Sequence, residues 1–272
     1  MRRRTAALVI GVLAAVCLGL VLSVAYPFTT SAPHAATPGD KFTVGEADAF
    51  SATGAITVDG ETRLAFDGAV AADGTWYQRV VERDVVSEEY RSPDGPVYRR
   101  VTVEDGEAAD QRRDQLAEQD RVSLLRESRD GDCVTFVTRR KTTSTTEPVS
   151  GTASVFVNNL WVAGYEATGT DSGVTTYRPR PGWYESGATY RLTDVSGTVR
   201  ADAESAAVTR ANVSWQLTRG GTYAQYVLSS LVGDGPTASR TTFSFDGTAP
   251  DLERPGWASD DEPNSSDVPR TC

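Results

Sequence analysis

The residues that carry out most protein chemistry are scarce or scattered in this chain of 272 residues. Histidine occurs once, at His34, and the three cysteines are Cys17, Cys133 and Cys272. A catalytic histidine must lie beside a nucleophile, yet His34 falls in a stretch of proline, alanine and threonine. Zinc sites need several histidines or paired cysteines, and these cysteines form no C-x-x-C pattern. We therefore predict that the protein is not an enzyme and has no metal site and no cofactor.

The negative net charge argues against some classes of binding partner. The chain has 27 Lys and Arg against 37 Asp and Glu, a formal net charge of −10. Nucleic-acid binding needs clustered positive charge, so we expect no nucleic-acid partner. So many carboxylates make near pairs inevitable, and paired carboxylates can hydrolyse glycosides. No such pair stands out within an apolar stretch, which leaves a hydrolase as the third and weakest functional hypothesis.

Aromatic side chains are the most suggestive set for binding. A hydrophobic ligand needs a hollow lined mainly by apolar and aromatic groups. The alternative is that these residues fill an ordinary core, which Trp and Tyr also do well. Phe156 and Leu160 are spaced i, i+4 and share one helical stripe. The residues that we predict to line a ligand space are Trp76, Phe156, Leu160, Trp161, Trp183 and Trp215.

The N-terminus predicts export to a membrane surface. Arg2–Arg4 precede an uncharged, apolar run from Ala6 to Tyr26, long enough as a helix to span about 30 Å of hydrocarbon. Positive charge stays on the cytoplasmic side, so the body faces outward. We expect residues 1–26 to be a retained signal anchor and transmembrane helix. Cleavage after Ala25 and lipidation at Cys17 remain as alternatives, although Val16 departs from the usual lipidation motif.

Composition divides the rest of the chain into three parts. Residues 27–45 are rich in Pro, Ala and Thr and read as a stalk, residues 46–248 as a β-rich domain, and residues 249–272 as an acidic disordered tail. Outside the cell, Asn212 and Asn264 start sequons for N-glycosylation. There Cys133 and Cys272 either form a disulfide or remain free thiols, and the loose tail favours the latter.

Turn signals and alternation predict an antiparallel sheet. Eight Asp-Gly dipeptides mark tight turns, and the segments between them alternate apolar and polar residues. Two stretches, 108–128 and 154–164, favour helices instead, and 223–231 is ambiguous. The expected fold class is α+β, mainly antiparallel β: a curved sheet or half-barrel of about ten strands with the two helices covering its concave face. Strands are expected near 50–58, 62–70, 75–83, 86–91, 97–104, 132–140, 165–178, 189–203, 207–217 and 239–246, with a break at Asp171 left open in the strand 165–178.

Several stretches resemble a known group of proteins. They are G-T-W-Y-Q-R (74–79), T-A-S-V-F-V-N-N-L (152–160), A-G-Y-E-A-T-G-T (163–170) and Y-R-L-T-D-V-S-G-T-V-R-A-D (190–202). With the lysine-poor, acidic composition, they are similar to an uncharacterised family of haloarchaeal surface lipoproteins. The expected strand order and helix placement also resemble the lipoprotein-carrier class of half-barrels, whose concave face holds acyl chains. The resemblance implies a halophilic cell-surface protein and transfers no catalytic residue.

Three functional hypotheses follow. The first is a membrane-anchored, non-catalytic binding protein on the extracellular side, with a hydrophobic or lipid-like ligand in the half-barrel. The second is a structural or interaction protein of the cell envelope with a filled core. The hydrolase is the third. The interior separates the first two, because a binding protein needs a lined hollow between sheet and helices.

Overall fold

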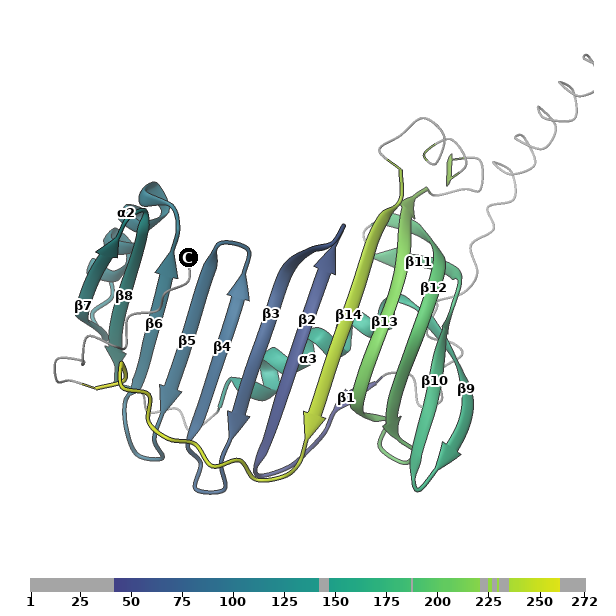
Figure 1. Cartoon of the computed structure of the whole chain (residues 1–272), viewed down its shortest axis with the longest axis horizontal. Coiled ribbons are helices and arrows are strands. Elements are labelled where there is room, and N and C mark those ends of the chain that lie inside the picture. The colour runs from purple at the N-terminus through teal and green to yellow at the C-terminus, as the bar shows by residue number, and fades with distance from the viewer. Residues whose placement is uncertain are drawn as a thin grey trace, which may run out of the picture.

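A single open sheet dominates the computed structural model, which describes residues 42–141, 147–186, 188–220, 225–226, 229 and 235–259. Its fourteen strands lie in the order β7-β8-β6-β5-β4-β3-β2-β14-β13-β12-β10-β9, with β1 beside β13 and β11 beside β12 (Figure 1). The mainly antiparallel fold is confirmed, and the expected number of about ten strands is too small. The strands are β1 (Thr43–Val44), β2 (Phe50–Val58), β3 (Glu61–Val70), β4 (Trp76–Glu82), β5 (Val85–Arg91), β6 (Val97–Val103), β7 (Val122–Asp130), β8 (Cys133–Arg140), β9 (Gly164–Asp171), β10 (Val174–Arg180), β11 (Gly182–Ser186), β12 (Ala188–Asp202), β13 (Ala207–Arg219) and β14 (Thr237–Asp246).

The strand order joins two parts of the chain in the middle of the sheet. β2 pairs with β14 in antiparallel register from Ser51↔Asp246 to Val58↔Ser239. On one side of this pair, β2 to β6 follow one another as neighbours, and on the other side β14 is followed by β13 and β12. β1 pairs with β13 in parallel, and Phe42 just before it is buried. The end of the segment expected to be a stalk therefore belongs to the folded body.

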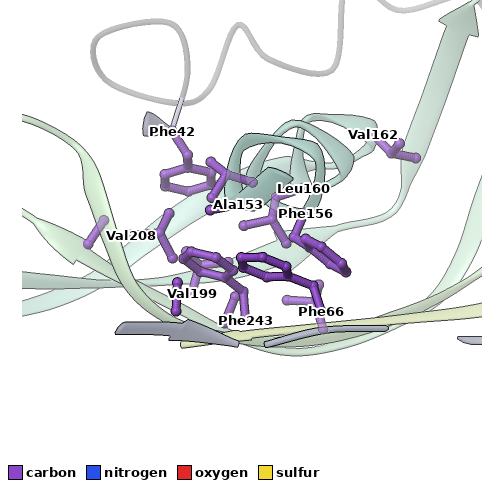
Figure 2. Close-up of a cluster of buried hydrophobic side chains, with 14 of the residues drawn as sticks. Phe42, Phe66, Ala153, Phe156, Leu160, Val162, Val199, Val208 and Phe243 are labelled. Carbon is purple, nitrogen blue, oxygen red and sulfur yellow. The ribbon is translucent and has the colours of Figure 1, made fainter. Parts of the chain in front are cut away.

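Helix α3 (Val149–Asn159) packs its apolar side on the sheet and continues into a 3-10 turn, η2 (Leu160–Val162). We call the sheet surface that it contacts the helix face, and the opposite surface the outer face. Figure 2 shows Phe156 lying over Phe66, and the two rings are stacked with centroids 5.8 Å apart. A Cβ atom at Gly54 would lie 2.6 Å from the Phe156 ring. Glycine at this position thus lets the helix approach the sheet closely.

Helix α2 (Gly106–Ala117) covers the other end of the helix face. Asp105 caps it by accepting a hydrogen bond from the Glu107 N–H, and Leu116 packs with Phe136 of β8 in a separate buried cluster. The helix expected over 108–128 is too long, because Val122–Asp130 form β7 and pair with β8. Pairing with a neighbouring strand here outweighs the helix propensity of Leu, Arg and Glu.

Two other expected elements are adjusted by the structure. The helix expected over 154–164 begins at Val149 and ends at Asn159, before the 3-10 turn. Of the two alternatives for 165–178, the strand with a break at Asp171 is confirmed: Ser172 and Gly173 adopt positive φ angles and turn the chain from β9 into β10. Both residues are exposed, so this turn is compatible with a tight hairpin.

The chain after β14 crosses the outer face to reach the strands β6 to β8 (Figure 1). We call residues 249–259 the C-terminal strap. Its Trp257 is buried, and the centroid of the indole ring lies 5.1 Å from the guanidinium carbon of Arg100. The backbone carbonyl oxygen of Trp257 accepts a 2.7 Å hydrogen bond from Arg126 Nη2. Arg254 lies over the ring of Tyr98. The disorder expected from residue 249 onward therefore does not extend to the strap.

Some predictions fall on residues that are not described. The anchor over residues 1–26, Cys17 and Asn264 lie outside the described ranges. Within those ranges, no helix is long and apolar enough to cross a membrane.

Cys133 at the start of β8 is disulfide-bonded, so the expectation of a free thiol at this position is wrong.

Candidate binding site

The helical stripe predicted from sequence is present, and it is closed by packing. Phe156 and Leu160 both have no exposed surface and belong to the main core cluster, together with Phe66 and Phe243 (Figure 2). Figure 2 shows Phe156 and Leu160 directed toward the sheet, where they meet Phe66 and Phe243. Phe156 and Leu160 are therefore in contact with protein atoms rather than with a ligand space.

Two of the predicted tryptophans are buried in the sheet. Trp76 of β4 and Trp215 of β13 are 3% and 2% exposed, and within the described part of the chain neither indole Nε1 has a hydrogen-bond partner. Trp76 lies in the main core cluster. Trp215 also lines a hollow of about 570 Å³ with Asp194 and Arg240. A buried N–H without an acceptor costs free energy, so both positions are tolerated only because the rings pack well.

The other two tryptophans, Trp161 and Trp183, make separate contacts. Trp161 in η2 is half-buried, and its Nε1 donates a 3.2 Å hydrogen bond to the carbonyl oxygen of Phe42. Trp183 in β11 is 5% exposed, with the Arg191 guanidinium 5.4 Å from its ring and the Tyr226 ring edge-on at 6.4 Å. The six predicted residues thus do not form the wall of one shared cavity.

A different hollow lies where α3 and η2 end. Its volume is about 660 Å³, within the range of roughly 300–1,000 Å³ that is common for small-molecule sites. We call it the tyrosine hollow, after Tyr184 and Tyr190. The lining residues are Asn159, Val162, Tyr184, Tyr190, Leu217, Thr218, Arg219, Ser229, Gly235 and Thr237.

Strand pairing positions the two tyrosines. Tyr184 of β11 faces Tyr190 of β12 in antiparallel register, and their rings lie 6.5 Å apart at an angle of 32°. Tyr190 in turn pairs with Arg219 of β13, two residues after Leu217. Directly opposed residues project on the same side of a sheet, so the hairpin brings both rings to one wall.

The helix end supplies the polar part of the hollow. Asn159 Nδ2 donates a 2.6 Å hydrogen bond to Thr241 Oγ1, which fixes the amide against β14. Tyr165 donates a 2.8 Å hydrogen bond from its hydroxyl to the Leu160 carbonyl oxygen, and burial raises the pKa of Tyr165 well above its ordinary value. The tyrosine therefore remains a neutral donor and holds the end of the helix in place.

The chemistry of this lining suits a molecule with an apolar body and a polar end. Val162, Leu217 and the two tyrosine rings offer apolar surface, whereas Asn159 and the threonines offer hydrogen bonds. Arg219 is exposed and adds a positive charge. Across the described ranges, no group of three or more His, Cys, Asp or Glu side chains is placed to hold a metal ion.

The sequence contained a signal for the tyrosine hollow that the prediction of site residues missed. Tyr184 and Tyr190 flank a short segment with a glycine, which is typical of a hairpin, and hairpin pairing would have placed them face to face.

The glycosylation candidate Asn212 lies exposed on β13, where its Oδ1 accepts a 3.0 Å hydrogen bond from Arg240 Nε.

No protein-family model matches the chain, and no curated protein matches it either. The resemblance to haloarchaeal surface lipoproteins and to lipoprotein carriers therefore remains an expectation, and the function is argued from the geometry alone.

Proposed function

We propose that this chain is a non-catalytic, membrane-anchored binding protein on the extracellular side, which holds a hydrophobic or lipid-like ligand at one end of an open half-barrel. The observation that carries the proposal is the tyrosine hollow, with its volume of about 660 Å³ and its aromatic and aliphatic lining. The ligand site moves from the α3 stripe predicted by sequence to the end of that helix.

The distribution of apolar and polar groups supports an amphipathic ligand. An acyl chain would lie against Tyr184, Tyr190 and Leu217, and its head group would meet Asn159 or Arg219. Sites of this kind combine a mostly apolar wall with a few polar groups that orient the ligand. An anionic head group would be favoured at Arg219, because a guanidinium pairs well with carboxylate and phosphate.

The second candidate function is a structural or interaction protein of the cell envelope, and one observation favours it. The core beneath α3 is filled, since Phe156, Leu160 and Val157 are 0–1% exposed. The protein would then act through its surface. The two functions differ in whether the tyrosine hollow takes up a ligand.

A fluorescent fatty acid distinguishes the two functions. The full chain in detergent is titrated with a dansyl-labelled fatty acid, the fluorescence of the same detergent without protein is subtracted, and we expect the protein-dependent fluorescence to rise and saturate. Leu217→Arg, which places a charge in the hollow, should weaken the affinity about tenfold or more, the equivalent of roughly 1.4 kcal/mol. The matched control is Leu124→Arg, because Leu124 on β7 is already 44% exposed and lies outside the hollow.

The outcomes are separable. Saturable binding that Leu217→Arg weakens and Leu124→Arg leaves unchanged would support the carrier function. A wild-type chain that binds no probe would favour the structural function, and unchanged binding in Leu217→Arg would place the ligand outside the tyrosine hollow. The proposed location has its own test: protease added to intact cells should degrade the body, and protection until lysis would contradict it.

A further inference from the structure

A strip of polar side chains runs across the helix face from α3 toward α2. Thr152 Oγ1 of α3 donates to Gln78 Oε1 at 3.0 Å, and Gln78 Nε2 donates to Glu89 Oε2 at 2.8 Å. Arg99 Nε lies 3.5 Å from Glu89 Oε1 and donates to Ser87 Oγ at 3.1 Å. The strip leads from the apolar core to a small cavity beneath α2.

The lining of this cavity carries an excess of positive charge. Its volume is about 50 Å³, and three arginines and one carboxylate line it, giving a formal charge of +2 in a chain whose net charge is −10. The single carboxylate, Glu89, already pairs with Gln78 and Arg99. The lining residues are Glu89, Val97, Arg99, Arg112, Leu116, Gln119, Val122, Thr138 and Arg140.

Arg112 of α2 has a donor that these contacts leave unused. Its Nη1 donates to Gln115 Oε1 at 3.3 Å, but its Nε is buried and has no hydrogen-bond partner among the described residues. Burial, and then the nearby Arg99 cation, lower the pKa of Arg112. A buried donor needs an acceptor, and two neighbouring cations need a negative charge. One anion between them would meet both requirements.

We infer that this cavity is a chloride site, formed by Arg112, Arg99 and Arg140. A water molecule occupies about 30 Å³ of liquid, and chloride is only slightly larger, so a cavity of this size admits a halide ion. It is too small for a fatty acid or a sugar. Bound chloride would link α2 to β6 and β8 and thereby stabilise the fold.

The test measures unfolding at constant sodium concentration while chloride replaces gluconate. A ligand that binds only the folded state at ten times its dissociation constant should lower the unfolding equilibrium constant roughly tenfold. We expect the unfolding equilibrium constant of the wild-type chain to fall about tenfold for each tenfold rise in chloride above the dissociation constant, and that of Arg112→Gln to change much less. The matched control is Arg113→Gln, which removes the same charge from α2, but from a side chain that pairs with Asp110 and Glu127.

Each outcome decides the inference. A chloride dependence of unfolding that Arg113→Gln keeps and Arg112→Gln loses supports it, and a full chloride dependence in Arg112→Gln overturns it. Should Arg112→Gln not fold, crystals of the wild-type chain in sodium bromide decide instead. An anomalous peak beside Arg112 Nε would support the site, and no peak in the cavity would overturn it. Neither result depends on whether the tyrosine hollow binds a ligand.

Discussion

The contact between Phe156 and Gly54 offers the sharpest test of the packing beneath α3. Phe156 is fully buried, stacks on Phe66, and lies where a Cβ atom on Gly54 would have to be. We consider three variants: Phe156→Ala, Gly54→Ala and the double variant. The two single changes act in opposite directions on the same space, because one removes the ring and the other adds a methyl group under it.

The expected magnitudes follow from the closeness of this contact. Phe156→Ala should lower the free energy of unfolding by about 3–5 kcal/mol, the usual cost of losing a buried phenylalanine ring. Gly54→Ala should cost about 1–3 kcal/mol, because its new Cβ would lie 2.6 Å from the ring and force α3 to shift. In the double variant the methyl group occupies space left by the ring. The costs should then be non-additive by about 0.5–3 kcal/mol, with the double variant more stable than the sum.

The measurement is denaturant unfolding of the full chain, followed by tryptophan fluorescence, with the same slope required of all four proteins. Additivity to within about 0.5 kcal/mol would refute the argument that Gly54 exists to admit Phe156. A loss below about 1 kcal/mol in Phe156→Ala would refute the filled core itself, and would reopen the α3 stripe as a ligand space.

Three further predictions concern charge and the C-terminal strap. The unfolding midpoint should rise from dilute buffer to molar salt, because the net charge of −10 destabilises the compact fold by self-repulsion and salt shortens the screening length from about 10 Å at 0.1 M to 3 Å at 1 M. A flat curve would contradict this. Hydrogen bonds from the backbone N–H and hydroxyl of Ser205, and from the Glu204 N–H, lower the pKa of Asp202. The ionised Asp202 side chain therefore stabilises the fold above about pH 4, and this stabilisation is lost as the pH falls. In thermal melts, the stability difference between wild type and Asp202→Asn should shrink below that pH. A difference that is independent of pH would refute this prediction. Trp257→Ala should release the strap from Arg100 and accelerate its cleavage in limited proteolysis; an unchanged cleavage rate would show that Trp257 does not hold it.

The turn signals in the sequence were informative but had more than one meaning. Asp59-Gly60 does connect β2 to β3, with both residues at positive φ. Asp105-Gly106 instead begins α2, because an aspartate side chain caps a helix as readily as it starts a turn. Asp67-Gly68 lies inside β3, where glycine leaves room for Phe66 and for Val149 of α3. Dipeptides alone do not distinguish these roles.

Long-range pairing explains most of the remaining errors. Residues 122–128 consist largely of good helix formers, and only their register with β8 makes them a strand. The strap was expected to be disordered because it is polar, yet its burial depends on Tyr98 and Arg100, which are more than a hundred residues earlier. Pairing in three dimensions is not encoded in local composition.

The candidate site illustrates the same limit. The stripe of Phe156 and Leu160 was predicted correctly as a face of a helix, since i, i+4 spacing determines it. Whether that face meets a ligand or the sheet depends on Gly54, a residue about a hundred positions away that no helical pattern includes. The hairpin of β11 and β12 could be predicted locally, but the hollow also depends on the register of β12 with β13 and on the position of the helix end, which local sequence does not specify.

The pairing of β2 with β14 has a consequence for how the protein is made. These strands are separated by almost the whole described chain, so closing them carries a large loop-closure entropy and raises the contact order. Because β14 is the last strand of the described chain to be synthesised, β2 must remain without this neighbour while the intervening chain emerges. A chain that ended before Thr237 would leave β2 and β13 as two unpaired edges, each a template for aggregation. The middle of the sheet therefore closes only after β14 has left the ribosome.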